Sequence, residues 1–167
     1  MATTVSPVAA AEESVLRNLA QLYAYDFADI MGWDIPESGR FPDAIVDGCF
    51  ASELRHPFFL RADGRLAGFA IVDTRSRLSG EEGVRDMAEF FVARPLRGRG
   101  VGAAAARVLF DRFGGRWEVR QTPQNGPAQA FWRSVIADYT GGAFSDVFLD
   151  APAWRGPVQS FVCPERG

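Results

Sequence analysis

The sequence predicts an α/β protein, an α+β arrangement with a central mixed β-sheet flanked by helices. Three observations lead to this prediction. The chain opens with an amphipathic helical pattern, apolar runs of strand length then alternate with helical segments, and the last two runs follow each other with no helix between them. The 167 residues suit one core, so residues 1–167 are expected to form a single domain.

The N-terminal third is expected to contain helices and loops. Residues 1–11 are small and polar and are expected to form a loose tail. From Glu12 to Met31, apolar side chains recur at steps of three and four residues, which is the pattern of an amphipathic helix. The glycines and prolines of residues 32–42 predict a loop. A short helix is expected over residues 43–53.

The middle of the chain predicts a hairpin and then a central strand. Two apolar runs, Phe58 to Leu60 and Leu66 to Val72, flank Asp63-Gly64, where glycine accepts the positive φ of a tight turn. Polar residues 75–85 are expected to form a connection. The apolar run from Met87 to Val92 is interrupted by one Glu and predicts a central strand.

The C-terminal half is expected to alternate between helices and strands. A turn over residues 97–102 leads into an alanine-rich helix that stops at Gly114-Gly115. A strand from Trp117 to Gln121 and a loop at 123–126 are expected next, followed by a helix from Pro127 to about Ala137. The chain is then expected to end with two strands, Phe144 to Leu149 and Pro157 to Val162, around a turn at Trp154 to Gly156.

Composition excludes several classes of function. The formal net charge is −3 and every basic residue is Arg, so a basic face for nucleic acid is not expected. No apolar run reaches 18 residues, and the first residues lack the charged start of a signal peptide, so no membrane partner and a cytoplasmic location are expected. Cys49 and Cys163 match neither a metal-ligand spacing nor a disulfide framework, so reduced thiols and no metal are expected.

A glycine-rich turn between the central strand and the next helix predicts an anion site. The first N–H groups of a helix lack partners, and the helix dipole adds positive potential there. Glycines allow a ligand close to the backbone, and two arginines add charge. The spacing differs from that of a dinucleotide fold, and a P-loop needs a Lys that the chain lacks. The residues concerned are Arg97, Gly98, Arg99, Gly100, Val101 and Gly102.

Two motifs resemble those of the GNAT superfamily of N-acetyltransferases. Arg97-x-x-Gly100-x-Gly102 resembles its pyrophosphate motif, Gln/Arg-x-x-Gly-x-Gly/Ala, and Asn125-x-x-Ala128-x-x-Phe131-Trp132 is similar to its Asn-x-x-Ala-x-x-Phe/Tyr-Tyr helix. The helix with Tyr25-Asp26-Phe27 and the Glu-Phe-Phe-Val strand look like a bacterial group of acetyltransferases of unassigned substrate. The resemblance covers most of the chain. It implies splayed central strands that hold acetyl-CoA, or a related acyl-CoA, as co-substrate.

The resemblance also implies which residues contact this co-substrate. The turn would bind its pyrophosphate, and the backbone of Phe91 and Val92, at a bulge that ends the strand, would contact the pantetheine arm. Asn125, Phe131 and Trp132 complete the expected contacts. Many relatives have a Tyr at position 132 whose hydroxyl protonates the departing thiolate. Trp132 has no acidic proton, so this role is vacant or has moved, with Tyr139 as one replacement.

Three carboxylates are candidates for the base that deprotonates an amine acceptor: Glu89, Asp86 and Glu118. Glu89 interrupts a buried strand and is either the base, an anchor for the amine, or the partner of a core Arg. Asp86 is at the position of the base in some histone-acetylating relatives, as the resemblance implies, and is otherwise a solvated strand end. Glu118 is either an alternative base or a structural residue. Glu89 is preferred, because it stands three residues before Val92 and has apolar neighbours that should raise its pKa.

The acceptor would lie near the first helix, as the resemblance implies, where Tyr25, Asp26 and Trp33 would cover its pocket. Tyr23 belongs to the same region, and packing is the alternative for both tyrosines. The expected reaction is direct attack of a primary amine, in a small molecule, on the thioester. The alternative function is an acyl-CoA-binding regulatory module without turnover. The net acidity favours a cationic or neutral acceptor over an acidic one. The sequence leaves the oligomeric state open, with a homodimer as one option.

Overall fold

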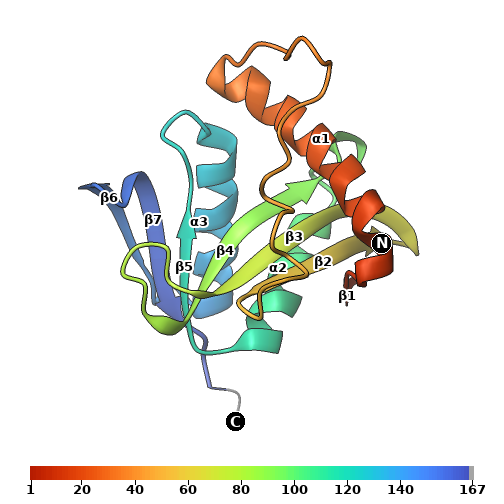
Figure 1. Ribbon diagram of the computed structural model, residues 1–167. Coiled ribbons are helices and arrows are strands. Elements are labelled where there is room, and N and C mark those ends of the chain that lie inside the picture. Colours follow the sequence, from red (N-terminus) through yellow and green to blue (C-terminus); the bar gives the residue numbers. More distant parts are fainter. Residues whose placement is uncertain (166–167) are drawn as a thin grey trace.

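The computed structural model describes residues 1–165 and contains one seven-stranded mixed sheet with the strand order β1-β2-β3-β4-β5-β7-β6 (Figure 1). Only the contact between β4 and β5 is parallel. The elements are β1 Thr3–Pro7, α1 Glu13–Met31, β2 Arg55–Ala62, β3 Arg65–Arg75, β4 Glu82–Val92, α2 Val101–Phe113, β5 Arg116–Arg120, α3 Gly126–Thr140, β6 Ser145–Ala151 and β7 Trp154–Val162.

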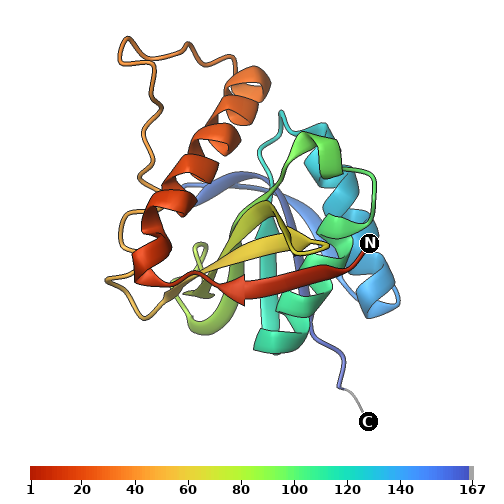
Figure 2. The same cartoon turned by 90° about the vertical axis from the view of Figure 1, so that its right-hand side faces the viewer.

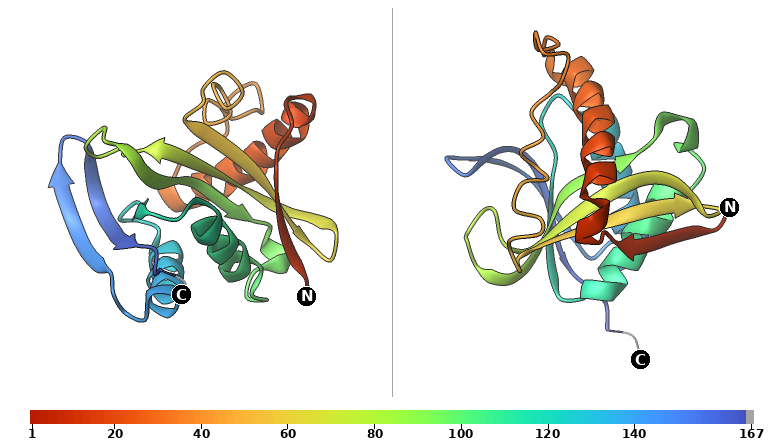
Figure 3. Two further views of the ribbon diagram at one scale, coloured as in Figure 1. Left: turned by 90° about the horizontal axis from the view of Figure 1, so that it is seen from below. Right: turned by 45° about the vertical axis from the view of Figure 1, so that its right-hand side comes forward.

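The helices cover opposite faces of the sheet. Leu16 and Ala20 of α1 pack against Phe59, Phe69 and Phe91, and this side is called the α1 face from here on. On the other face, α2 and α3 pack against Val72, Met87 and Trp117. Figure 2 and the left panel of Figure 3 show α1 on one side of the sheet and α2 with α3 on the other. The predicted mixed sheet with flanking helices is therefore confirmed.

Most predicted elements are present, but two N-terminal ones are wrong. The loose tail expected over residues 1–11 contains strand β1, which pairs with β2 from Thr3↔Ala62 to Pro7↔Phe58 and buries Val5. Its single inward apolar residue gives no alternation that the sequence could reveal. The short helix expected over residues 43–53 is instead a run of turns over residues 44–51, in which Gly48 has a φ of +80° that is incompatible with a continuous α-helix.

Two strand boundaries also differ from the prediction. Strand β4 begins at Glu82, so much of the polar stretch expected to connect the strands is paired, with Arg75↔Glu82 at its edge. The last turn lies at residues 152–153, before Trp154, which pairs with Ala151. Residues Trp154 to Gly156, expected as the turn, form the start of β7. Proline and glycine are tolerated where a strand begins, and this hid the β7 start in the sequence.

An irregularity in β4 places the polar residues of the sheet. Ile71 pairs with Glu89 and Val72 pairs with Met87, so Ala88 is an extra residue that forms a β-bulge. Because side chains alternate along a regular strand, residues three apart normally point to opposite faces. The bulge shifts this alternation, and Asp86 and Glu89 therefore lie on the same face, the α1 face.

Candidate active site

The two central strands separate just beyond their first residues. The recorded parallel pairing between β4 and β5 consists of Arg85↔Trp117 and Asp86↔Glu118. From Met87 to Val92, β4 pairs with β3 alone. The free edge of β4 therefore offers backbone N–H and C=O groups to a ligand that enters between the strands. This is the splay of central strands that the family resemblance predicted.

Glu89 lies on the α1 face beside this separation. The hydroxyl of Tyr23, from α1, donates a 2.6 Å hydrogen bond to Glu89 Oε2. The Tyr23 ring is held edge-on against Phe27, Phe69 and Phe91, at centroid distances of 4.9, 5.4 and 5.8 Å. The Glu89 carboxylate is thus held by one hydrogen bond, from the Tyr23 hydroxyl of α1.

The environment of Glu89 changes its acidity in opposing ways. Desolvation raises the pKa of the Glu89 carboxyl above its usual value, because burial disfavours the charged form. The hydrogen bond from Tyr23 and the charges of Arg55, Arg77 and Arg120 oppose this shift in the pKa. Burial and the neighbouring carboxylate raise the pKa of Tyr23 well above its usual range, so its hydroxyl stays protonated and donates.

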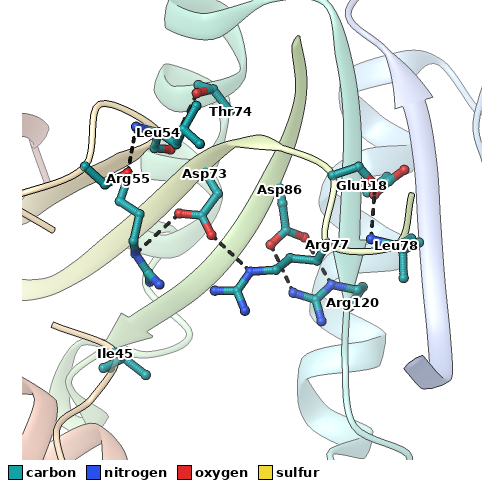
Figure 4. Close-up of polar contacts among 12 residues, drawn as sticks. Ile45, Leu54, Arg55, Asp73, Thr74, Arg77, Leu78, Asp86, Glu118 and Arg120 are labelled. Atoms are coloured by element: carbon teal, nitrogen blue, oxygen red, sulfur yellow. Dashed lines mark hydrogen bonds and ion pairs between the residues drawn. The ribbon is translucent and has the colours of Figure 1, made fainter. Parts of the chain in front are cut away.

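Asp86, the second candidate base, is fully buried and has a dedicated partner. Arg120 Nε and Nη2 donate to its two carboxylate oxygens at 3.1 and 3.0 Å (Figure 4). The Arg120 guanidinium also lies over the Trp154 ring, 4.7 Å from its centroid. Desolvation raises the pKa of Asp86 and the Arg120 bonds oppose that rise. The two bonds from Arg120 favour the charged form of Asp86 and occupy one lone pair of each oxygen, which makes Asp86 less available as a base than Glu89.

Glu118, the third candidate, lies next to Asp86 on β5 and accepts a 2.8 Å hydrogen bond from the Ser76 hydroxyl. Ser76 Oγ also accepts hydrogen bonds from the backbone N–H groups of Leu78 and Ser79, at 3.1 and 3.0 Å. Glu118 is therefore attached to the loop between β3 and β4. Glu118 pairs with Asp86 across the strands and lies further from Glu89 than Asp86 does.

The glycine-rich turn, which the sequence predicts as an anion site, has open space beside its backbone and leads directly into a helix. Gly98 and Gly100 have φ values of +71° and +82°, which other residues adopt poorly, and a Cβ at either would have nothing within 4 Å. Gly100 precedes α2, whose first i→i−4 bond runs from the Ala104 N–H to the Gly100 carbonyl, at 3.0 Å. The N–H groups of Val101, Gly102 and Ala103 come before this first bond, so they have no partner within the helix, as at any helix start.

The arginines of the turn differ in their partners. Arg97 Nε donates to the Val92 carbonyl at 2.7 Å, and its Nη2 donates to Asp26 of α1. Arg94 also pairs with Asp26, at 2.8 Å. Arg99 is exposed. The structure thus brings Asp26, expected at the acceptor pocket, into contact with the predicted anion site.

The Asn125 motif forms the start of α3 and part of the core. Asn125 Oδ1 accepts from the Ala128 N–H at 3.2 Å and so caps the helix. Phe131 stacks on Phe90 at 5.9 Å, and a Cβ at Gly102 would lie 3.1 Å from the Phe131 ring. Trp132 is buried against Phe90, with ring centroids 4.9 Å apart.

Tyr139 does not approach the separated strands. Its hydroxyl donates a 2.8 Å hydrogen bond to Asp111 Oδ1 on α2, and its ring packs on Phe110 and Phe161. Desolvation and the bond to Asp111 raise its pKa far above the usual range. A phenol with these contacts is not a replacement for the acid that Trp132 lacks.

The other residues expected at the acceptor pocket lie toward the end of α1. Tyr25 and Trp33 are both more than half exposed, and Trp33 stacks on Phe27 at 6.2 Å. Tyr23 is the tyrosine of α1 that contacts Glu89, a partnership that the sequence did not predict. Its place in the inward pattern with Leu16 and Ala20 was the available signal, because a hydroxyl on a buried face needs a partner.

Three buried polar atoms at the far end of β5 were also not predicted from the sequence. Gln121 Oε1, Thr122 Oγ1 and Trp154 Nε1 have no hydrogen-bond partner within residues 1–165. They lie where β5 ends and β7 begins, next to Arg120. Buried atoms of this kind need water or a ligand to complete their bonds. In the described part of the chain, no group of His, Cys, Asp and Glu could hold a metal ion, and no helix could span a membrane.

Several solved acetyltransferase structures have the same fold as this chain. An acetyltransferase from Thermus thermophilus superposes with a TM-score of 0.68 at 17% identity, over 97% of both chains. The ribosomal-protein-S18-alanine N-acetyltransferase from Escherichia coli gives 0.60 at 15% identity, over 99% of this chain and 97% of that one. Aminoglycoside acetyltransferase AAC(6′)-Ib in complex with coenzyme A gives 0.64 at 16% identity, over 96% and 95%.

Sequence comparison gives one curated relative and one family. Phosphoribosylamine–glycine ligase from Caulobacter vibrioides (strain ATCC 19089 / CIP 103742 / CB 15) is 33% identical over 94 residues, which are 56% of this chain but 20% of that protein. The chain therefore spans a fifth of that relative's length. The model of the acetyltransferase (GNAT) family matches residues 17–135, well over half of the chain. This match, together with the splayed strands and the turn before α2, shows that the chain belongs to the acetyltransferase (GNAT) family.

Proposed function

We propose that this protein transfers the acetyl group of acetyl-CoA to a primary amine of a small molecule, with Glu89 as the base. The observation that carries the proposal is the position of Glu89 on the α1 face, beside the separation of β4 and β5 and bonded to Tyr23. Two structural neighbours have names that specify amine acceptors, the S18 alanine and the aminoglycosides, which supports the same reaction class here.

The residues present fit the co-substrate. The N–H groups that open α2, the open space at Gly98 and Gly100, and the exposed Arg99 suit a diphosphate. The edge of β4 that β5 leaves unpaired near Val92 suits an extended arm with amide groups, because such an arm can pair with a strand edge. The Val92 carbonyl at this edge already accepts a hydrogen bond from Arg97 Nε. The co-substrate would supply the activated acetyl group, and the acceptor would approach from the α1 face.

Glu89 addresses the main energetic obstacle, which is the proton on the amine. An alkyl ammonium with a pKa of about 10.4 is neutral in roughly 1 part in 2,500 at pH 7, a cost of about 4.6 kcal/mol. A carboxylate whose pKa is raised by burial is a better base than an exposed one. Glu89 takes the first proton from the ammonium and passes it to water, which gives the neutral amine. As the nitrogen–carbon bond forms and the carbon–sulfur bond breaks, the second proton leaves the nitrogen for Glu89 or water, and the electron pair leaves with the sulfur.

Neither of the two residues considered for the acid, Trp132 and Tyr139, is placed to take that role. Trp132 is buried in the core, and Tyr139 is bonded to Asp111. The thiolate would leave unprotonated and take a proton from water, which is acceptable for a thiol with a pKa of about 8.5.

The test is amine-dependent release of free thiol from acetyl-CoA, measured with a broad panel of primary amines. The acetylated product is identified by mass spectrometry. Thiol release that depends on an amine supports acetyl transfer. Tight binding of acetyl-CoA without thiol release from any amine supports the regulatory module instead.

A further inference from the structure

A pocket of arginines lies on the α1 face, at the loop end of β3. It is lined by Ser52, Leu54, Arg55, Asp73, Arg75, Ser76 and Arg77 and has a volume of about 240 Å³. We call it the arginine pocket. It lies at one end of a polar row that crosses the sheet through the pairs Arg55↔Asp73, Asp73↔Asp86 and Asp86↔Glu118.

The arginine pocket has more guanidinium groups than carboxylates to pair with them. Asp73 is its one lining carboxylate, and it faces Arg55 Nε at 3.4 Å and accepts a 3.2 Å hydrogen bond from Arg77 Nε. Arg75 is paired separately, with Glu82. Among the lining residues, Arg55 and Arg77 therefore share the single carboxylate of Asp73, and the lining carries a net positive charge. Outside the lining, both arginines also act on Glu89, and Arg77 acts on Asp86.

Both guanidinium groups have donors to spare. Arg55 Nη2 is buried and has no hydrogen-bond acceptor within residues 1–165, and Arg55 Nε, also buried, has only its 3.4 Å ion pair with Asp73 Oδ1. Arg77 donates through Nε, and its side chain is 46% exposed. Buried donors without acceptors are rare in folded proteins and indicate that water or a ligand completes them. A planar guanidinium is best completed by a carboxylate or a phosphate, which it binds through two bonds.

The pocket and Glu89 belong to one surface. Asp73 pairs with Asp86, and Ile71 pairs with Glu89. Because of the bulge at Ala88, Asp86 and Glu89 face β3 residues that are only two apart, which is about 7 Å at ~3.3 Å per residue. The charges of Arg55, Arg77 and Arg120 all act on the Glu89 carboxyl. Figure 4 shows these three guanidinium groups side by side across the strands. Arg120 binds both carboxylate oxygens of Asp86, whereas Arg55 and Arg77 share one carboxylate and are the better candidates to bind a ligand.

On the basis of the proposed function, we propose that the acceptor carries an oxyanion, a carboxylate or a phosphate, which binds Arg55 and Arg77 while its amine lies at Glu89. Such a molecule is a zwitterion. It is therefore compatible with a chain whose net charge of −3 disfavours purely anionic substrates. The amine and the oxyanion would be separated by a chain of several carbons, because the pocket and Glu89 are separated along the sheet.

The test compares ω-amino acids and ω-aminoalkyl phosphates, from three to eight carbons, with plain alkylamines of the same length. Acetylation is measured as kcat/KM for each. The expected result is a preference for the anionic acceptor of about tenfold or more at one chain length. The carboxylate and phosphate series then identify which oxyanion is used. An equal kcat/KM for charged and plain amines at every length would overturn the proposal.

Arg77→Gln removes the more exposed guanidinium of the pocket. Arg65→Gln, which removes one positive charge at an exposed position at the start of β3, is the control. Arg77→Gln should abolish the preference, mainly through a higher KM for the anionic acceptor, and Arg65→Gln should retain it. A preference that survives Arg77→Gln, or that Arg65→Gln also removes, contradicts the assignment to this pocket.

A binding measurement separates this inference from the proposed function. Calorimetry compares an N-acetylated ω-amino acid with the N-alkylacetamide of the same length, and needs no turnover. Tighter binding of the anionic compound that depends on Arg77 supports the pocket even if no amine is acetylated. Equal binding of both compounds, with acetyl transfer intact, refutes the pocket alone.

Discussion

The Tyr23 hydroxyl lies 2.6 Å from Glu89 Oε2 and links α1 to the central strand across 66 residues of sequence. The bond lowers the pKa of Glu89, whereas burial raises it. Tyr23 is therefore a positioning residue that also sets the acidity of the proposed base. Its ring contacts with Phe27, Phe69 and Phe91 give it a packing role that is separable from its hydroxyl.

Tyr23→Phe removes only the hydroxyl and should raise the pKa of Glu89 further. Because Glu89 must be ionised to accept a proton, the acid limb of the pH–rate profile should move to higher pH. The measurement is kcat/KM against pH for both proteins. Tyr25→Phe, which alters an exposed tyrosine of the same helix, is the control and should leave the profile unchanged. An unmoved acid limb in Tyr23→Phe would mean that Glu89 does not control the rate.

The raised pKa of Glu89 also predicts a dependence of stability on pH. The folded protein keeps this proton at a pH where the unfolded chain has lost it. The free energy of unfolding therefore falls as pH rises from about 4.3 to the raised pKa. Glu89→Gln does not ionise and so should not show this fall in the free energy of unfolding. Its amide oxygen can still accept the hydrogen bond from the Tyr23 hydroxyl. It should match the wild type at low pH and be more stable at pH 7.

Chemical denaturation of the two proteins across this pH range measures the difference. Glu37→Gln, at an exposed position in the loop after α1, is the control and should follow the wild type. If Glu89→Gln is less stable than the wild type at pH 7, the charged carboxylate is a structural partner.

The turn before α2 should be required for binding of coenzyme A. Gly100→Val forces a branched side chain to a φ of +82°, which distorts the backbone at the anion site although the added Cβ meets no atom. Calorimetry should show loss of coenzyme A binding. Gly142→Val introduces the same kind of strain at φ +87° beyond α3, and should lose stability while keeping coenzyme A binding. Equal affinity in both variants would exclude the turn as the diphosphate site.

Asp26 should oppose binding of coenzyme A, because its carboxylate holds Arg94 and Arg97 next to the anion site. Asp26→Asn releases these guanidinium groups and removes a negative charge worth about 1 kcal/mol in a hydrated setting, which is roughly fivefold in affinity. The dissociation constant should fall by that factor. Asp29→Asn, at an exposed position on the same helix, should leave it unchanged. A weaker affinity in Asp26→Asn would instead show that Asp26 positions Arg97 for the ligand.

The sequence revealed the parts of the fold that have strong local patterns. The hairpin at Asp63-Gly64, the strand through Glu89 and the helices after residues 100 and 125 were all predicted, because periodicity and glycine positions report on local structure. Strand β1 was missed because it depends on pairing with β2, a contact that only the folded chain provides.

The candidate site was predicted by position but not by geometry. The bulge was expected at Phe91 and Val92, whereas the structure places it at Ala88. That displacement decides which carboxylates share a face, and no residue type signals it. Asp86 and Glu118 could not be separated from Glu89 by sequence, because their partners Arg120 and Ser76 come from other segments.

The rate of amine-dependent thiol release by Glu89→Gln at pH 7 tests the proposed chemistry most directly. With coenzyme A affinity unchanged, the turnover rate should fall by about 10²–10⁴-fold, the usual contribution of a general base, and should partly recover at high pH, where the amine is already neutral. Turnover near the wild-type rate at pH 7, with coenzyme A bound as tightly, would contradict the assignment of Glu89 as the base and leave Asp86 or Glu118 in that role.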